Sequence, residues 1–339
     1  MGLKCGHNIN YSITNLSLND IILITKFRLI ERRSFAINND DLSFFPVVDI
    51  DASWVVRRCG NISVDCRVTY LLHLCCLLIK NGCCVNIVCD GDRRHHSKRS
   101  TTKREVDCYR NRVDYHFLKC KLSCLPIDNI TTDDGIEDPE IKELKKKVKS
   151  LEKKVSEAVV DVGNVLYNQI KNRIDKMLVE GEVNNNQLTI MQAEFQADIV
   201  IAFRTVKHLN HLVFSSDSDQ GIHCGSDCIC IKEFELKYEK KQTTLEKIGL
   251  FCTNVRTMHI ICDTINLPYD NFKVKQPKYN ILDNVNDLPV QALIAIGIGC
   301  DVYLDGVPGI TPKSINDFFQ SEKKHKGGSL SDQLINYFC

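Results

Sequence analysis

The sequence predicts an α/β fold with a mostly parallel central sheet flanked by helices. Three observations lead to this prediction: a strand–helix–strand unit over residues 44–90, a third apolar strand that ends near 219, and aspartates at the ends of these strands. Two buried strands joined by one helical crossover are typical of a parallel βαβ unit. Functional sites in such sheets lie at the carboxyl ends of the strands.

The first unit is the clearest. "FFPVVDI" predicts a buried strand that ends at Asp51, and "CVNIVCD" predicts a second that ends at Asp90. Between them, residues 68–79 predict a buried helix, which is too short to span a bilayer. The start lacks a signal-peptide pattern, and the 18 cysteines include no C-x-x-C pair. We therefore expect an intracellular protein whose thiols are reduced and mostly fill the core.

The middle of the chain is strongly helical from about 139 to 180. Its apolar residues step by three and four, as in a heptad seam, with Lys and Glu on the other faces: Ile141, Leu144, Val148, Leu151, Val155, Ala158 and Val162. "QLTIM" then predicts a short strand, and "ADIVIAFRTVKHL" predicts a helix. "CICIKEFEL" predicts a hairpin strand, whereas residues 236–285 are polar and predict no clear element.

Carboxylates end most of the apolar segments. Asp217 and Asp219 end the third strand, "NHLVFSSDSD", and Asp301 ends the apolar helix "LPVQALIAIGIGCD". Glu194 and Asp198 flank a predicted helix start. Gathered at one sheet edge, these acids repel each other unless divalent cations neutralise them, and oxygen ligands favour Mg²⁺ or Mn²⁺. Two such ions, about 4 Å apart, support in-line attack on a phosphodiester. The alternative for any single aspartate is a turn or N-cap role.

Five sequence blocks, in order, resemble the flap endonuclease or XPG-type structure-specific nucleases. "VVDIDASW" resembles the V-x-x-D-A-S block, and "IVCDGDRRHHSKRSTTKR" resembles the F-D-G block with its basic helix start. "AEFQADIVIA" is similar to P-x-E-A-(D/E)-x-x-x-A, and "VFSSDSDQ" to S-x-D-x-D. "GCDVYLDGVPGITPKS" resembles G-(C/S)-D-Y-x-x-G-(V/I)-x-G-I-G-x-K. The resemblance implies a PIN-like fold with a helical arch insertion and a C-terminal helix-hairpin DNA-binding element.

The resemblance also implies roles for individual residues. It implies metal ligation by Asp51, Asp90, Asp198, Asp217, Asp219 and Asp301. Arg104 falls where the family has an arginine, and Lys98 lies close to the position of its lysine. Both cations of the family reach the scissile phosphate, where they balance charge on phosphorus. Nucleic-acid contacts are implied for the rest of the basic cluster and for the hairpin: Arg93, Arg94, Arg99, Lys103, Gly306, Gly309 and Lys313. The alternative for the basic cluster is a solvated face.

Two positions depart from the family pattern. Gln196 stands where the family has Glu, and its amide adds no charge to the metal site. Glu194 lies two residues earlier, and it takes the place of the family's Glu if the match between this chain and the block is shifted by two residues. Thr311 replaces a glycine of the hairpin, which restricts how closely that backbone can approach a phosphate.

The resemblance divides the chain into four parts. Residues 1–110 and 187–298 form the nuclease domain, 111–186 form the arch-like insertion, and 299–339 form the helix-hairpin segment. The seam at 141–162 is either part of an arch that admits a single-stranded end or a plain coiled-coil partner helix. "SDQLINYF" resembles a sliding-clamp-binding peptide through Leu334, Tyr337 and Phe338, with an amphipathic helix as the simpler interpretation.

Together these features predict a structure-specific 5′ nuclease that hydrolyses DNA with two Mg²⁺ ions, Mn²⁺ being the alternative metal. We expect it to act in DNA replication or repair, in the nucleus, on DNA with a free or branched 5′ end. The alternatives are a catalytically weak or inactive nucleic-acid-binding relative of the family and a 5′-exonuclease that acts on RNA.

Overall fold

The structure of the protein is a computed structural model. It describes residues 9–35, 44–58, 64–91, 99–124, 138–158, 163–215, 220, 228–239, 242–271, 273–281, 285, 288–300, 306–321 and 329–338. Within these ranges it gives the backbone alone at 34–35, 64, 99–105, 108, 156–158, 163–165, 238–239, 242 and 288.

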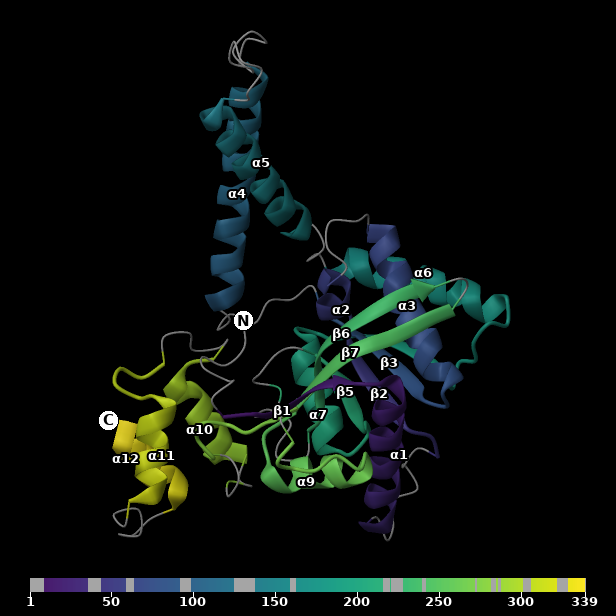
Figure 1. Cartoon of the computed structure of the whole chain (residues 1–339), viewed down its shortest axis with the longest axis vertical. Helices are drawn as coiled ribbons and strands as arrows, with labels where there is room; N and C mark the ends of the chain where they lie inside the picture. Colours follow the sequence, from purple (N-terminus) through teal and green to yellow (C-terminus); the bar gives the residue numbers. More distant parts are fainter. Residues whose placement is uncertain are drawn as a thin grey trace.

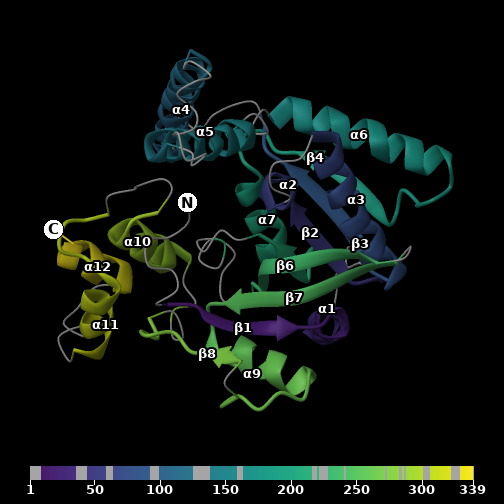
Figure 2. The ribbon, with the colours of Figure 1, turned by 45° about the horizontal axis from the view of Figure 1, so that its top comes forward.

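An eight-stranded sheet forms the centre of the fold, with strand order β4-β3-β2-β5-β6-β7-β1-β8 (Figure 2). The strands from β4 to β6 run parallel: β2 (Val47–Asp51), β3 (Cys84–Cys89), β4 (Leu188–Gln192), β5 (Leu212–Phe214) and the start of β6 (Cys230–Glu239). The strand–helix–strand prediction over 44–90 is therefore confirmed, and so is the α/β class.

The other half of the sheet is antiparallel. β6 forms a hairpin with β7 (Gln242–Cys252), which pairs with β1 (Tyr11–Leu16), and β1 pairs with β8 (Val274–Lys275). The sheet is thus more mixed than the sequence predicted, because β1, β7 and β8 lie in segments for which we predicted no strand.

Helices cover both faces of the parallel half. α2 (Ala52–Arg58), α3 (Val64–Lys80) and α6 (Gly163–Val179) pack in the main core, where Leu71, Leu74 and Leu78 of α3 are fully buried at helical spacing. α7 (Ala197–Val206) packs in a separate cluster with Val88 and Val213. Since successive strand residues face opposite sides, α7 covers the other face.

Two helices cover the antiparallel half of the sheet. α1 (Leu18–Phe35) contacts β7, and α9 (Val255–Thr264) contacts both α1 and β1. The main core therefore continues beneath this half, where Tyr11 and Ile13 of β1 are buried.

A helical hairpin projects from this body. It consists of α4 (Arg99–Ser123) and α5 (Pro139–Ala158), which pack against each other (Figure 1). Ile141, Leu144 and Val148 of the predicted seam are buried or half-buried, whereas the flanking Lys and Glu are exposed. The seam therefore serves this pairing, and an arch function stays a prediction.

The C-terminal helices form a separate small core. α10 (Leu288–Ile298), α11 (Pro312–Gln320) and α12 (Leu330–Phe338) lie together at one side of the molecule (Figure 1). Val290, Ile294 and Leu334 are buried in the core that these helices share. Leu334 is fully buried, and the Tyr337 hydroxyl donates to the Ser314 carbonyl at 3.1 Å. Clamp binding by this segment would thus require α12 to leave α10, and an amphipathic helix accounts for the pattern.

The described helices include none that is both long and apolar enough to cross a membrane. The thirteen cysteines whose side chains are described are thiols rather than disulfides. Most of these thiols are buried, in accord with the prediction that they fill the core.

Candidate active site

Three of the predicted carboxylates lie along the carboxyl edge of the parallel strands. Asp51 ends β2, where it pairs in register with Val88, and Asp90 directly follows β3. Asp198 lies in the first turn of α7, which begins at the same edge. All three side chains are half-buried.

The Asp90 carboxylate is held by two donors. Ser53 Oγ donates to its Oδ2 at 2.8 Å, and the backbone N–H of Ala197 donates to its Oδ1 at 2.9 Å. Because Ser53 is in α2 and Ala197 begins α7, Asp90 joins both helices to the end of β3. Neither of these positioning partners was predicted, although Ser53 lies within the "DASW" block.

Gly91 brings the next segment against Asp90. Its N–H donates to the Phe195 carbonyl at 3.0 Å, and the Ala193 N–H donates to the Cys89 carbonyl at 2.9 Å. A Cβ at Gly91 would lie 2.2 Å from the Ala193 oxygen and 2.4 Å from the Glu194 oxygen. Only glycine therefore allows the 193–195 backbone to approach so closely.

The Asp51 carboxyl is affected by its acidic neighbours. Burial, followed by the charges of Asp198 and Asp90, raises the pKa of Asp51 well above its usual value. Arg57 and the Trp54 N–H, which donates to Asp51 Oδ1 at 3.1 Å, lower that pKa. Repulsion among the acids exceeds this compensation, so the cluster favours binding of a proton or a cation.

Cys89 lies in the same electrostatic field. Burial raises the pKa of its thiol, and the charges of Asp51 and Asp90 raise it further. Both carboxylates therefore act on the last residue of β3, which places their charge at this edge of the sheet.

Asp198 has a polar partner of its own. Gln220 Nε2 donates to Asp198 Oδ1 at 2.7 Å. Gln220 directly follows the predicted ligands Asp217 and Asp219 in the sequence, and this contact fixes Gln220 itself beside α7. Nothing in the sequence pattern singled out this glutamine.

Gln196 and Glu194 flank the approach to α7. Gln196 is the N-cap residue of α7, with extended φ and ψ of −135° and 142°, and its side chain does not cap the helix. Gln196 is half-buried and Glu194 is exposed. Metal ligation by either residue stays a prediction.

The predicted hairpin is a tight turn that leads into α11. Gly306 and Gly309 have φ of +66° and +83°, and the Ile310 N–H donates to the Val307 carbonyl at 3.0 Å. Thr311 is the N-cap of α11 in a capping box with Ser314, which gives this departure from the family pattern a structural role. Lys313 is exposed in the first turn of α11.

The remaining predicted residues fall elsewhere. Asp217, Asp219, Asp301, Lys98, Arg93 and Arg94 lie outside the described residues, and Arg99, Lys103 and Arg104 are described as backbone at the start of α4. Within the described part of the chain, no three His, Cys, Asp or Glu side chains come close enough together to hold a metal ion. Metal ligation therefore stays a prediction.

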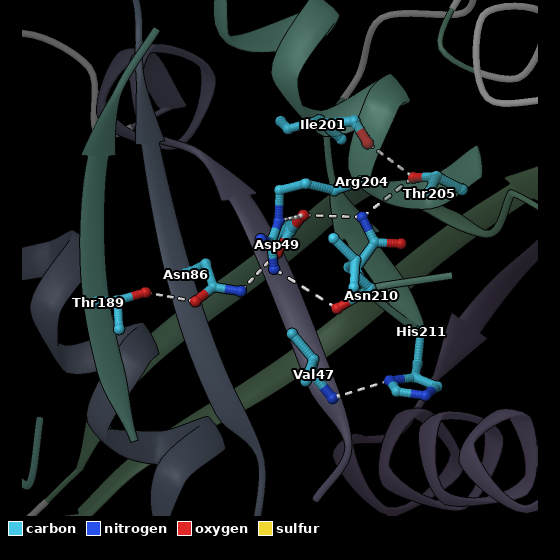
Figure 3. A network of polar contacts seen from close by, with 10 residues as sticks. Val47, Asp49, Asn86, Thr189, Ile201, Arg204, Thr205, Asn210 and His211 are labelled. Atoms are coloured by element: carbon cyan, nitrogen blue, oxygen red, sulfur yellow. Dashed lines mark hydrogen bonds and ion pairs between the residues drawn. The ribbon is translucent and has the colours of Figure 1, made fainter. Parts of the chain in front are cut away.

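A second polar cluster lies beneath this edge (Figure 3). Asp49, fully buried in β2, accepts from Arg204 Nε at 2.8 Å, from Asn210 Nδ2 at 2.8 Å and from Asn86 Nδ2 at 2.8 Å. Thr189 Oγ1 donates in turn to Asn86 Oδ1. The cluster thus joins β2, β3, β4 and α7, and it was not predicted from the sequence.

Comparison with known proteins gives matches among solved structures alone. No family model and no curated protein matches the chain. Human GEN1 in complex with Holliday junction DNA is 13% identical with a TM-score of 0.40, over 86% of this chain and 53% of that one. The catalytic core of Rad2 in complex with DNA substrate is 13% identical with a TM-score of 0.35, over 86% and 71%.

Flap endonuclease-1 from Methanococcus jannaschii is also 13% identical, with a TM-score of 0.37, over 86% of this chain and 78% of that one. It carries the name of the family that the five sequence blocks resemble. This chain spans about half of the GEN1 chain. The roles of the site residues therefore rest on this chain's own contacts.

Proposed function

We propose that this chain is a divalent-cation-dependent nuclease that hydrolyses phosphodiester bonds in DNA with a free or branched 5′ end. The observation that carries the proposal is the convergence of Asp51, Asp90 and Asp198, from three separate elements, at one sheet edge. The neighbouring charges raise the pKa of Asp51, so the acids are close enough to repel each other.

The donor set fits Mg²⁺ or Mn²⁺. Carboxylate oxygens are the ligands that these hard cations prefer, and a cation would offset the repulsion at Asp51. We propose that Asp51, Asp90 and Asp198 hold the cations together with Asp217, Asp219 and Asp301. Bound there, two cations would activate water and stabilise the leaving oxygen at phosphorus.

The surrounding residues have supporting roles in this proposal. Ser53 and the Ala197 N–H orient Asp90, and Gln220 orients Asp198. Lys98 and Arg104 would offset charge on the phosphoryl group. The basic cluster at 93–104, together with the hairpin residue Lys313, would hold the backbone phosphates. A role in DNA replication or repair, in the nucleus, belongs to the same proposal.

The test is cleavage of a labelled 5′-flap duplex in Mg²⁺ and in EDTA. We expect the wild type to cleave in Mg²⁺ but not in EDTA, and Asp51→Asn to lose cleavage in Mg²⁺. The control is Asp65→Asn, which changes an exposed aspartate at the start of α3 and should cleave normally. Absence of metal-dependent product at high enzyme concentration would exclude the nuclease function. Cleavage by Asp51→Asn at the wild-type rate would exclude this site.

Two further arms address the substrate. The same flap made of RNA tests the alternative of an RNA exonuclease, because two-metal chemistry at phosphorus does not require or forbid the 2′-hydroxyl. Binding to DNA measured from 50 to 200 mM salt should weaken steeply if the basic cluster contacts phosphates. Binding without cleavage would favour the non-catalytic relative, for which Gln196 is the supporting observation.

A further inference from the structure

Helix α7 is tied to the sheet at both ends. At its start, the Ala197 N–H donates to Asp90 Oδ1 at 2.9 Å. Near its end, Arg204 Nε donates to Asp49 Oδ2 at 2.8 Å, and Arg204 Nη2 donates to the Leu209 carbonyl at 3.4 Å. The proposed ligand Asp198 lies between these ties, one residue after the first.

Asp49 is an unusual residue for its place. It is fully buried in the middle of β2, between the apolar residues Val48 and Ile50. A buried ion pair gains little stability over apolar side chains of similar volume, because removing both charges from water is costly. Stability alone therefore does not account for Asp49 and Arg204.

The contacts of Asp49 depend on one arrangement of the elements around it. Asn86 from β3 binds one carboxylate oxygen, and Arg204 with Asn210 binds the other (Figure 3). Asn210 also donates to Thr205 Oγ1 at 3.0 Å. Directional bonds of this kind are lost when a helix slides, whereas apolar contacts tolerate such a shift.

We infer that Asp49 and Arg204 are positioning residues that fix α7 along β2 and thereby set where the Asp198 carboxylate lies relative to Asp51. Asp49 and Asp51 are two residues apart on one strand and face the same side. Arg204 lies six positions after Asp198 in α7, which is about 9 Å along the helix axis. A shift of the helix at Arg204 therefore also moves Asp198. The inference rests on the proposed function, in which Asp198 binds a cation.

The test compares Mn²⁺ binding by calorimetry in wild type, Asp49→Asn, Arg204→Met and the double variant Asp49→Asn/Arg204→Met. The double variant removes both charges and keeps one acceptor oxygen at position 49, which can accept from either Asn86 or Asn210, so we expect it to fold. We expect its Mn²⁺ affinity to fall about tenfold or more, and the Ala197 amide to exchange hydrogen faster. The control is Met258→Ala, in the core of α9 away from α7, which lowers stability without changing Mn²⁺ affinity.

The outcomes separate the inference from the proposed function. A wild type that neither binds Mn²⁺ nor cleaves DNA would contradict the proposed function. A wild type that binds Mn²⁺, together with a double variant of equal affinity, would overturn the positioning role. If the double variant fails to fold, Arg204→Lys keeps the charge but not both contacts, and wild-type Mn²⁺ affinity in Arg204→Lys and in Asp49→Asn would overturn the inference as well.

Discussion

The Asp90 carboxylate accepts a hydrogen bond from the Ala197 backbone N–H at 2.9 Å, although 107 residues separate the two. The first N–H groups of a helix have no partner within the helix, and a side-chain oxygen usually supplied by the preceding residue satisfies one of them. In α7 the N-cap residue Gln196 does not cap with its side chain. Asp90 instead satisfies one of these groups, the N–H of the first helical residue Ala197, from the end of β3.

The first prediction follows from this bond. We expect Asp90→Ala to lower the free energy of unfolding by about 1–2 kcal/mol, the usual range for a lost helix cap. Asp90→Asn keeps an acceptor oxygen and should cost less. Urea unfolding monitored by circular dichroism measures both, with Asp65→Asn as the control. Both variants remove the charge that repels Asp51, so equal stability of Asp90→Ala and Asp90→Asn would show that the bond does not anchor α7.

The second prediction concerns the repulsion at Asp51. The pKa of Asp51 is raised in the fold, so its ionisation weakens the fold as pH rises through that folded value. At neutral pH we expect Asp51→Asn to be more stable than wild type in EDTA and to lose cleavage. Thermal unfolding in EDTA and in Mg²⁺ is the measurement. A lower melting temperature of the variant in EDTA would contradict this account of the cluster.

The third prediction uses two glycines. A Cβ at Gly91 would meet the Ala193 and Glu194 oxygens, whereas at Gly82, which has a φ of +85°, it would meet nothing within 4 Å. Gly91→Ala must therefore push the 193–195 backbone away from Asp90, which we expect to weaken Mn²⁺ binding. Gly82→Ala should cost about 1–2 kcal/mol of backbone strain and leave Mn²⁺ binding unchanged. Mn²⁺ titration and urea unfolding of both variants decide this.

The elements around the site were predictable because their signals are local. β2, β3 and α3 each show their apolar pattern within a dozen or so residues, and Asp51 and Asp90 directly follow such patterns. The convergence of these ends follows from parallel topology alone.

The parts that were missed depend on distant partners. Arg204 lies 155 residues from Asp49, and nothing in "VVDID" marks the first aspartate as buried and paired. β7 reads "QTTLEKIGLFC", in which polar residues obscure the strand until its pairing with β1 and β6 is known. From the sequence, Thr311 was expected to restrict how closely the hairpin backbone approaches a phosphate. Its role as the N-cap of α11 was missed because the helix start at Pro312 was not predicted.

The fourth prediction concerns pH. His211 is buried, its Nδ1 accepts from the Val47 N–H at 3.0 Å, and burial followed by the charges of Arg32 and Arg28 lowers its pKa to about 3. The fold keeps the His211 imidazole neutral. The contribution of His211 to the free energy of unfolding is therefore complete above the unfolded pKa of about 6.5, and it is lost as pH falls toward 3. The expected slope is about 1.4 kcal/mol per pH unit.

The variant His211→Asn removes this titration but keeps an oxygen that can accept from Val47. Its stability should therefore fall less than that of wild type between pH 6.5 and pH 4.5, where most carboxylates stay ionised. Urea unfolding across this range is the measurement, and His73→Asn on the exposed side of α3 is the control. Parallel pH profiles of His211→Asn and wild type would contradict the prediction.

The fifth prediction tests the departure at Gln196. This residue lies two positions before Asp198 and directly before Ala197, whose N–H donates to Asp90, and it is half-buried. A carboxylate here would add negative charge, and cation affinity rises with the number of charged ligands. We expect Gln196→Glu to lower the Mg²⁺ concentration for half-maximal cleavage by roughly tenfold, about 1.4 kcal/mol.

The variant Gln196→Glu should also lower the stability of the fold in EDTA, because it adds to the repulsion at Asp51. Gln276→Glu, exposed just after β8 at the antiparallel edge of the sheet, is the control. An unchanged Mg²⁺ requirement in Gln196→Glu would place residue 196 outside the metal site.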